Sequence, residues 1–266
     1  MGGVNPVAFY LFGRPIYWYG IMVALGFLSG IVHWTRRARS EGWPPEIGAD
    51  LGLWTMVGGL IGARAAYVAA NWPEYRGAPF SILRFDRGGL VYYGGFVGGV
   101  VAVAILARQR KRPLLEMGDF AIGAVPLGHA IGRVGCFING CCYGVPTAGP
   151  LGCVVAGARR HPVQLYEAMA NLAIYLVLLR ARPRRTGGRL ALYLMLYPPA
   201  RFLLEFWRGD ARLRWMGLTL AQLLSAALFA VGVLLWFRPP VPRVEGSASG
   251  SARRARGPTE DHAREA

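Results

Sequence analysis

Seven apolar stretches, each about as long as a membrane-spanning helix, constrain the fold of this chain more than any other feature. A helix needs about 20 residues to cross the hydrocarbon core of a bilayer. Only 17% of the residues are charged and 54% are hydrophobic, a composition typical of membrane proteins. The sequence therefore predicts an all-α polytopic membrane protein with about seven transmembrane helices, in which residues 1–238 form a single domain. The predicted spans lie near residues 16–35, 49–70, 89–107, 118–137, 163–180, 189–207 and 217–237.

The two ends of the chain differ in character. The N-terminal residues lack the basic start and the small-residue cleavage site of a secretory signal, so we expect them to stay in the mature protein. Residues 239–266 are rich in Pro, Gly, Ser and charge and lack the apolar side chains that a core requires. We expect this segment to be a disordered tail.

Basic residues set the expected orientation. The chain has 30 Lys and Arg against 14 Asp and Glu, an excess that would suit a nucleic-acid partner. These residues lie mostly in short clusters between apolar stretches, however, which is typical of membrane topology, and we expect no nucleic-acid partner. Cytoplasmic loops carry more basic residues than external ones. With the N-terminus outside, the inner segments hold 18 basic residues and the outer segments nine, so we predict an external N-terminus and a cytoplasmic C-terminus.

Three arginines, Arg64, Arg133 and Arg201, fall inside predicted spans. An arginine near the middle of a span costs about 2.5–3.5 kcal/mol on insertion scales. Snorkelling towards the headgroups or a structural ion pair is the alternative explanation for each one alone. In the predicted topology all three lie in the last third of spans that run from inside to outside. We therefore expect them to converge at the depth of the outer leaflet.

Tyrosines share that depth. Tyr19 and Tyr93 lie near the outer ends of their spans and are candidates for the same site. The neighbouring Tyr17, Trp18 and Tyr92 fit the aromatic belt found at membrane interfaces.

Span six adds an acidic residue and two prolines. Glu205 follows Arg201 by four residues, so their side chains share one helix face and can form an ion pair. Pro198 and Pro199 remove backbone donors inside the span, which is tolerated mainly where protein or a water-filled cavity covers the freed carbonyls. We predict a cavity here.

Two glycine-rich stretches have the small-xxx-small spacing that lets membrane helices approach closely. Close packing explains GGLIG, residues 58–62. In GGFVGG, residues 94–99, Gly94 and Gly95 can either pack against a helix or leave bare backbone open to a ligand.

An arginine cluster at the outer leaflet favours one kind of ligand. Guanidinium groups bind phosphate in a bidentate manner, and the anion always present at that depth is a phospholipid headgroup. In a reaction, the arginines would stabilise charge on a departing phosphate, and a tyrosine or glutamate would move a proton. The sequence therefore predicts an anionic-lipid site that faces outward.

The cysteines allow a metal or redox interpretation. Cys136, Cys141, Cys142 and Cys153, with His161, fit none of the usual paired zinc spacings, and vicinal cysteines chelate poorly. We therefore predict no metal and no cofactor. A disulfide from Cys153 to Cys141 or Cys142 on the oxidising side, and a role as small buried side chains, both remain open.

Seven short motifs together resemble those of one family. Their order and spacing, which cover nearly the whole chain except the tail, are specific, although each motif alone is weak. The motifs are WYGIM at 18–22, GARAAYV at 62–68, GGLVYYGG at 88–95, GRVGCFINGCCYG at 132–144, HPVQLYE at 161–167, RFLLEFWR at 201–208 and LTLAQLLS at 218–225. With these motifs the chain resembles the prolipoprotein diacylglyceryl transferases.

The resemblance implies an activity. The enzyme would transfer a diacylglyceryl group from phosphatidylglycerol to the thiol of a lipobox cysteine in an exported prolipoprotein. A thioether forms and glycerol phosphate is released. Such an enzyme is a multi-pass protein of the bacterial inner membrane, with the bilayer, the lipid and the prolipoprotein signal peptide as its partners. A non-enzymatic protein that binds or transports an anionic lipid is the alternative function.

The resemblance also assigns residues. The implied catalytic residues are Tyr19, Tyr93, Arg133, Arg201 and Glu205. The implied substrate-binding residues are Arg64, Gly94, Gly95, Arg133, Asn139, Gly140, Gly144 and Arg201, of which Arg133 is the phosphatidylglycerol ligand.

The chain departs from the family pattern at three positions. Tyr93 stands where many members have histidine, and Cys136 and Cys141 stand where many have Asn and Glu. Glu205 and Tyr93 are therefore our candidates for the base that deprotonates the thiol.

Four further polar residues lie within the predicted spans or at their ends. His129, one turn before Arg133, is a candidate to tune that arginine. For Asp119 and Glu167, at span ends, a solvated or capping role is sufficient. Gln164 and Glu167 belong to a family motif and are expected to support the site structurally.

Overall fold

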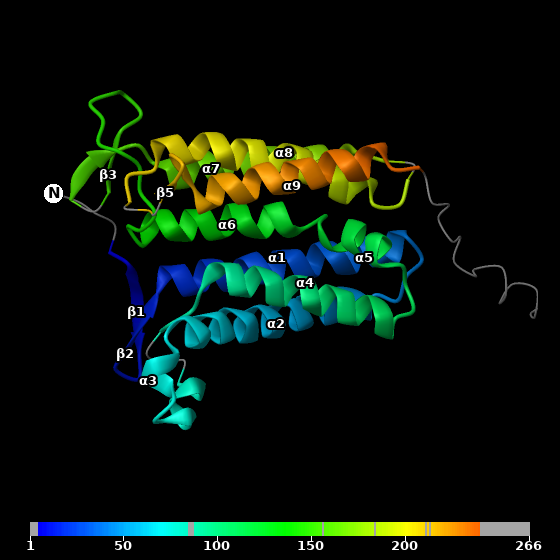
Figure 1. The fold of residues 1–266 in the computed structure, drawn as a ribbon, viewed down its shortest axis with the longest axis horizontal. Coiled ribbons are helices and arrows are strands. Elements are labelled where there is room, and N and C mark those ends of the chain that lie inside the picture. Colours follow the sequence, from blue (N-terminus) through cyan, green and yellow to red (C-terminus); the bar gives the residue numbers. More distant parts are fainter. Residues whose placement is uncertain are drawn as a thin grey trace, which may run out of the picture.

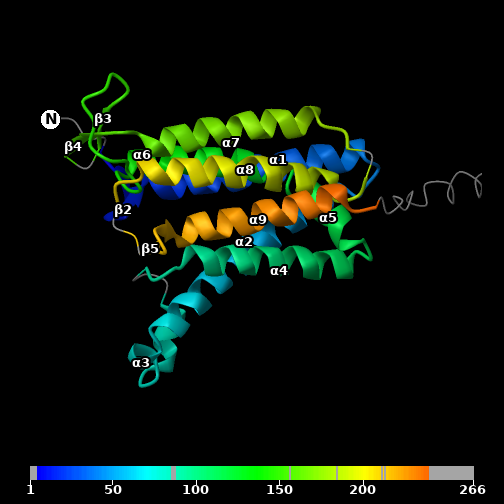
Figure 2. The same cartoon turned by 45° about the horizontal axis from the view of Figure 1, so that its top comes forward.

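The structure is a computed structural model, which describes residues 5–84, 88–155, 157–183, 185–210, 212 and 214–239. It is a layered bundle of long helices that run side by side (Figures 1 and 2). The long helices are α1 (Trp18–Ser40), α2 (Glu46–Ala70), α4 (Tyr92–Gln109), α6 (Val125–Ile138), α7 (Val163–Arg180), α8 (Gly188–Leu204) and α9 (Leu220–Phe237). Shorter helices are α3 (Trp72–Tyr75), α5 (Leu114–Ala121) and the 3₁₀ helices η1 (Pro79–Leu83) and η3 (Glu205–Trp207). The predicted tail, residues 239–266, lies almost entirely outside the described residues.

The long helices coincide with the predicted spans, but only some of them meet a strict test for crossing a membrane. Among the described residues, α1, α2, α7 and α9 are long and apolar enough to cross. Helices α5 and α6, which meet at a 43° bend, can together form a fifth span. The structure thus establishes a mostly helical protein with four or five candidate spans. The count of seven and the orientation remain predictions.

The prediction of an all-α fold needs one correction, because three two-stranded antiparallel sheets lie at one end of the bundle. The turns explain why hydropathy alone missed them, since Gly13 and Gly217 adopt positive φ angles that close tight hairpins. Figure 1 shows these hairpins beside the N-terminal end of α1. The strands are β1 (Val7–Leu11), β2 (Arg14–Tyr17), β3 (Cys153–Val155), β4 (Ala158–Arg160), β5 (Arg214–Trp215) and β6 (Leu218–Thr219).

Glycines bring α2 and α4 into close contact. A Cβ atom added to Gly98 would lie 2.1 Å from the carbonyl oxygen of Gly58, and one added to Gly62 would lie 2.3 Å from that of Gly94. No side chain fits in such a space, so these positions require glycine. The predicted role of GGLIG in helix packing is confirmed, and Gly94 of the GGFVGG stretch has the same role.

Two apolar cores lie at different places in the bundle. In one, Trp43 stacks on Phe120 with ring centroids 4.7 Å apart, next to the buried Leu51. The other joins Leu178 of α7 to Leu194 of α8. Elsewhere, large aliphatic side chains point outward, which suits a lipid environment rather than water.

Asp119 links α5 to the start of α8. Its carboxylate accepts hydrogen bonds of 2.8 Å from the backbone N–H groups of Gly187 and Leu190 at the start of α8. A carboxylate there satisfies helix N–H groups that have no partner within the helix and complements the positive end of the helix dipole. The capping role predicted for Asp119 is confirmed, although the capped helix is a distant one in sequence.

Candidate active site

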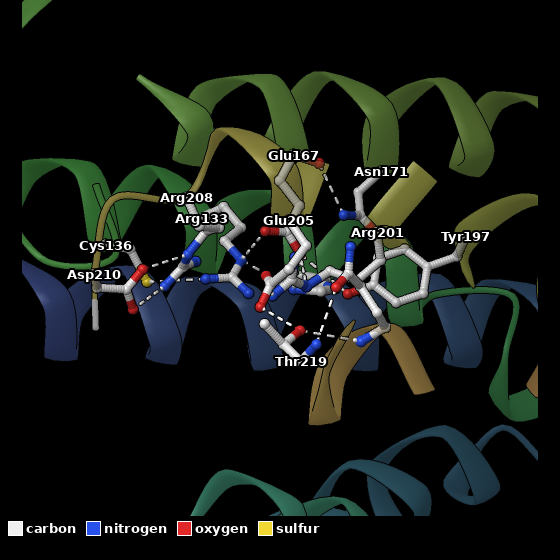
Figure 3. Close-up of polar contacts among 12 residues, drawn as sticks. Arg133, Cys136, Glu167, Asn171, Tyr197, Arg201, Glu205, Arg208, Asp210 and Thr219 are labelled. Carbon is white, nitrogen blue, oxygen red and sulfur yellow. Dashed lines mark hydrogen bonds and ion pairs between the residues drawn. The ribbon is translucent and has the colours of Figure 1, made fainter. Parts of the chain in front are cut away.

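Glu167 occupies the centre of a polar cluster between α6, α7 and α8. Its side chain is fully buried. Its Oε2 lies 3.0 Å from Nε of Arg133 on α6, and its Oε1 lies 3.8 Å from Nε of Arg201 on α8. The hydroxyl of Tyr197 donates a 3.0 Å hydrogen bond to Oε1. One carboxylate therefore bridges two of the three arginines predicted to converge (Figure 3).

The sequence of α7 places Glu167 on the buried face of that helix. The helix begins after Pro162, which occupies the N-cap position. Buried residues then recur every three or four positions, as expected for one helix face. They are Val163, Gln164, Glu167, Ala168, Asn171, Ile174 and Leu178.

Arg133 has further neighbours on its own helix. Its Nε lies 3.3 Å from Nε2 of His129, one turn earlier, and that histidine nitrogen lies 3.5 Å from Oε1 of Glu167. Its Nη1 lies 4.0 Å from Sγ of Cys136. The structure thus places His129 where it can orient Arg133, as the sequence suggests.

Arg201 and Glu205 form the predicted ion pair. Nη2 of Arg201 donates a 2.6 Å hydrogen bond to Oε2 of Glu205. The other oxygen of Glu205 accepts a 2.8 Å bond from the hydroxyl of Thr219, which also caps α9. Arg133, Glu167, Arg201 and Glu205, which we call the arginine–glutamate cluster, therefore contain equal numbers of opposite charges.

One guanidinium nitrogen in this cluster is left without a partner. Nη1 of Arg201 is buried and makes no hydrogen bond to any residue that the structure describes. A buried N–H group of this kind is costly unless something accepts from it. It is therefore a ready donor for an anion that enters the cluster.

Tyr92 and Tyr93 lie together at the start of α4, where their rings stack edge-on at a centroid distance of 5.8 Å. Tyr92 is 67% exposed and Tyr93 36%. Tyr93 is therefore the more buried of the two, and the interpretation of Tyr92 as an interfacial aromatic stays a prediction.

Tyr19 and Asn139 lie at the edge of the site. Both line a hollow of about 680 Å³ beside β2 and the start of α1. Tyr19 also lies close to α6, because a Cβ added to Gly135 would lie 3.5 Å from its Cδ2 atom. The two residues therefore lie beside the C-terminal part of α6, which carries Arg133.

The loop after α6 is held by specific backbone contacts. Gly140 adopts a positive φ of 70° and reverses the chain. Gly144 donates a 3.0 Å hydrogen bond to the carbonyl of His161, and a Cβ at this glycine would lie 2.5 Å from the same oxygen. Nε2 of Gln164 donates a 2.6 Å bond to the carbonyl of Cys141. Gly140, Gly144 and Gln164 thus shape the loop beside Arg133.

A further ion pair, between Arg208 and Asp210, lies at this end of the bundle. Arg208 binds Asp210 in a bidentate manner, with Nε–Oδ1 and Nη2–Oδ2 distances of 2.8 and 2.7 Å. The adjacent Gly209 donates a 3.0 Å bond to the carbonyl of Tyr143, so this turn pairs with the loop after α6. Burial raises the pKa of Asp210, but the hydrogen bonds and charge of Arg208 outweigh this and hold it below its ordinary value.

Arg64 lies in a different setting from the other two intramembrane arginines. Its guanidinium donates five hydrogen bonds of 2.8–3.1 Å to backbone carbonyls of the segment that links α2 to α4. The Cζ atom of Arg64 also lies 5.7 Å from the ring centroid of Tyr67 and 5.4 Å from that of Tyr75. The predicted convergence therefore holds for Arg133 and Arg201, while the described contacts of Arg64 organise a loop. The accepting carbonyls belong to Ser81, Ile82, Arg84, Gly88 and Gly89.

Gly94 and Gly95 also have a packing role. A Cβ at Gly94 would lie 2.4 Å from the Cβ of Ala66, and one at Gly95 would lie 3.3 Å from the carbonyl oxygen of Gly59. Both glycines thus face α2. Of the two roles considered from the sequence, packing against a helix and leaving backbone open to a ligand, the structure supports packing.

The cysteines are all reduced. None of the four, which all belong to the described residues, forms a disulfide. The sulfur of Cys153 instead lies 3.9 Å from the carbonyl of Leu151, so the disulfide considered from the sequence is not formed.

The protein is a helical bundle with several apolar helices, and a buried cluster of paired charges lies at one end of it. These features define a membrane protein with a polar functional site. Comparisons with known proteins give the same class and refine it. The sequence model described as "Prolipoprotein diacylglyceryl transferase" matches residues 6–238. The chain therefore belongs to the prolipoprotein diacylglyceryl transferase family.

Individual relatives agree with this family. The chain is similar to the proteins named phosphatidylglycerol–prolipoprotein diacylglyceryl transferase of three bacteria. Identity is 30% with that of Clostridium tetani, over 88% of this chain and 97% of the relative. It is 35% for Finegoldia magna, over 87% and 94%, and 37% for Clostridioides difficile, over 84% and 90%.

Proposed function

We propose that this protein transfers a diacylglyceryl group from phosphatidylglycerol to the thiol of a lipobox cysteine in exported prolipoproteins. The observation that carries the proposal is the bridging of Arg133 and Arg201 by Glu167, with a buried Arg201 N–H group left as a donor. Membership of the transferase family supports the choice of substrates.

The arginine–glutamate cluster suits a phosphate better than an isolated pair of arginines would. Without lipid, Glu167 and Glu205 offset the charges of Arg133 and Arg201. This pairing lowers the free-energy cost of burying both cations in an apolar environment. When phosphatidylglycerol enters, its phosphate accepts from Nη1 of Arg201 and from the exposed side of Arg133. The carboxylates keep both guanidinium groups oriented throughout.

The chemical step forms a C–S bond and breaks a C–O bond. The thiolate of the lipobox cysteine attacks the glyceryl carbon that carries the phosphate ester. The electron pair of the C–O bond leaves on the phosphate oxygen, and glycerol phosphate departs. Arg133 and Arg201 stabilise the charge that develops on this leaving group.

The thiol proton must leave before or during the attack, because a thiol is a far weaker nucleophile than a thiolate. Glu205 and Tyr93 are the proposed acceptors. Tyr19 and Asn139 line the opening through which the peptide thiol reaches the site. Arg64, through its loop contacts, shapes the same end of the bundle.

The topology of the proposed enzyme follows from its substrates. We propose that α4 and α8 also cross the membrane, because they run alongside the candidate spans (Figures 1 and 2). With the N-terminus outside, the cluster faces the outer leaflet of the inner membrane, where exported prolipoproteins arrive. The C-terminal tail is then cytoplasmic.

A defined assay tests the function. Purified protein is mixed with phosphatidylglycerol and a peptide that contains a lipobox cysteine, and glycerol phosphate release is measured together with the mass of the peptide. We expect release that depends on the peptide, and a gain of one diacylglyceryl group on its cysteine. Lipid binding without either product would instead favour a non-enzymatic lipid-binding protein.

A further inference from the structure

Three cysteines of the GRVGCFINGCCYG motif come together in the folded chain. The Sγ atoms of Cys136, Cys141 and Cys142 all lie within 4.8 Å of one another. Cys136 ends a buried turn of α6, and the other two follow in the loop. The proposed transfer reaction does not use these thiols.

The backbone explains how an irregular spacing produces this cluster. Gly140 and Cys142 adopt positive φ angles of 70° and 61°, so the chain folds back over the end of α6. The N–H of Cys141 donates a 3.2 Å hydrogen bond to the carbonyl of Cys136. A non-glycine residue with positive φ is uncommon, and such strain often marks a functional position. The spacing rules that exclude a metal site from the sequence do not allow for this reversal.

Two arginines stand beside the three sulfurs. Nη1 of Arg133 lies 4.0 Å from Sγ of Cys136, and the guanidinium of Arg208 contacts Cys142. Arg208 is buried and held by Asp210. These cations offset the negative charge that three thiolates would bring to the site.

We propose that Cys136, Cys141 and Cys142 bind one thiophilic d¹⁰ metal ion, Cu(I) or Zn(II). Thiolate sulfurs are the ligands that such soft ions prefer. Three sulfurs at about 2.3 Å from a metal lie roughly 4 Å apart, so the cluster needs to close by less than about 1 Å. Cu(I) would be three-coordinate, whereas Zn(II) would take a fourth ligand from water. Binding would release the thiol protons to solvent.

The site would tie the loop to the helix that carries Arg133. Cys136 lies three residues after Arg133, and Cys141 and Cys142 belong to the loop that Gln164 holds. A bound ion would therefore limit movement between this loop and α6. This inference does not rest on the proposed transferase activity, because it concerns thiols that take no part in it.

Metal titration of the reduced, full-length protein tests the proposal. Cu(I) is added in competition with bicinchoninate, and Zn(II) with a chromophoric chelator, in separate experiments. We expect one ion per chain, with thiolate-to-metal absorption in the ultraviolet for Cu(I). Cys136→Ser, Cys141→Ser and Cys142→Ser should each weaken binding by at least about tenfold.

Cys153→Ser is the matched control, because Cys153 lies outside the cluster and should leave binding unchanged. X-ray absorption of the loaded wild-type protein provides a measurement that needs no variant, and we expect three sulfur ligands at about 2.3 Å. The proposal is overturned if Cys153→Ser weakens binding as much as the cluster variants do. Fewer than three sulfur ligands, or a disulfide among the three cysteines in protein isolated without reductant, would also overturn it.

Discussion

Glu167 lies 3.0 Å from Arg133 and 3.8 Å from Arg201, so a single buried carboxylate links helices α6, α7 and α8. These contacts add a second carboxylate to the predicted Arg201–Glu205 ion pair, so that two arginines and two glutamates balance in charge. The Glu167 carboxylate offsets the charge of both arginines and fixes the orientation of their guanidinium groups. The site is therefore oriented before any lipid enters.

Replacement of Glu167 tests this network. We expect Glu167→Gln to destabilise the folded protein by about 3 kcal/mol, because it leaves two buried cations without their shared anion. Peptide-dependent glycerol phosphate release should fall at least about a hundredfold, since both arginines lose their orientation. Thermal unfolding in detergent and the lipidation assay measure the two effects. Glu74→Gln, at an exposed position, is the control and should behave as wild type.

Arg133 and Arg201 are expected to be essential for the reaction. Arg133→Ala and Arg201→Ala should each lower the rate at least about a hundredfold, because a donor to the leaving phosphate is lost. Lysine at either position should restore little activity, since an ammonium lacks the planar fork of a guanidinium. Arg76→Ala, on the exposed surface, is the control. Near wild-type lipidation by either alanine variant that still inserts in the membrane would contradict the mechanism.

Arg64 is predicted to act through its loop. We expect Arg64→Ala to increase amide hydrogen exchange in residues 81–84 and 88–90, because five hydrogen bonds to that loop disappear. Arg133→Ala should leave exchange in this loop unchanged. If Arg64→Ala abolishes phosphatidylglycerol binding while loop exchange stays the same, Arg64 is instead a direct ligand, as the resemblance implies.

Tyr92 and Tyr93 can be separated by conservative variants. We expect Tyr93→Phe to slow the reaction at least about tenfold at neutral pH, and more than Tyr92→Phe, because Tyr93 is the more buried of the two and is the proposed proton acceptor. The rate of peptide lipidation at saturating lipid is the measurement. A larger loss with Tyr92→Phe would contradict the role proposed for Tyr93.

The Arg208–Asp210 pair predicts a pH dependence. The pKa of Asp210 is lowered in the folded protein by Arg208, so its stabilising contribution is present above the unfolded pKa of about 3.9. That contribution is lost as the pH falls through the lower folded pKa. We expect Asp210→Asn to reduce the melting temperature at pH 7, and the difference from wild type to shrink only below about pH 4. A difference that already disappears between pH 7 and pH 5 would contradict this assignment.

The sequence predicted in part which residues lie at the same height along the bundle, whereas it did not predict the direction in which each side chain points around its helix axis. Hydropathy and topology place Arg64, Arg133 and Arg201 at one depth, and two of them do meet. Arg64 faces a loop because α2 packs on α4 through glycines that orient the helix.

Glu167 shows the same limit most clearly. Its position near the start of a span made a solvated or capping role sufficient, and the family motif indicated only structural support. Its central role depends on α7 packing between α6 and α8, which is a tertiary contact. Two signals were available in the sequence. Glu167 belongs to the motif HPVQLYE, and an acidic residue inside a span carries an insertion cost similar to that of an arginine.

Helix α8 is fastened at both ends. Asp119 holds its first turn, and Glu167 and Glu205 hold Arg201 in its last turn. Its 17 residues span about 25 Å, and Pro198 and Pro199 would otherwise let the helix flex near its C-terminal end. Because both ends are anchored, the axial position of α8 is fixed from its first turn, so the placement of Arg201 depends on a carboxylate at the opposite end of the helix.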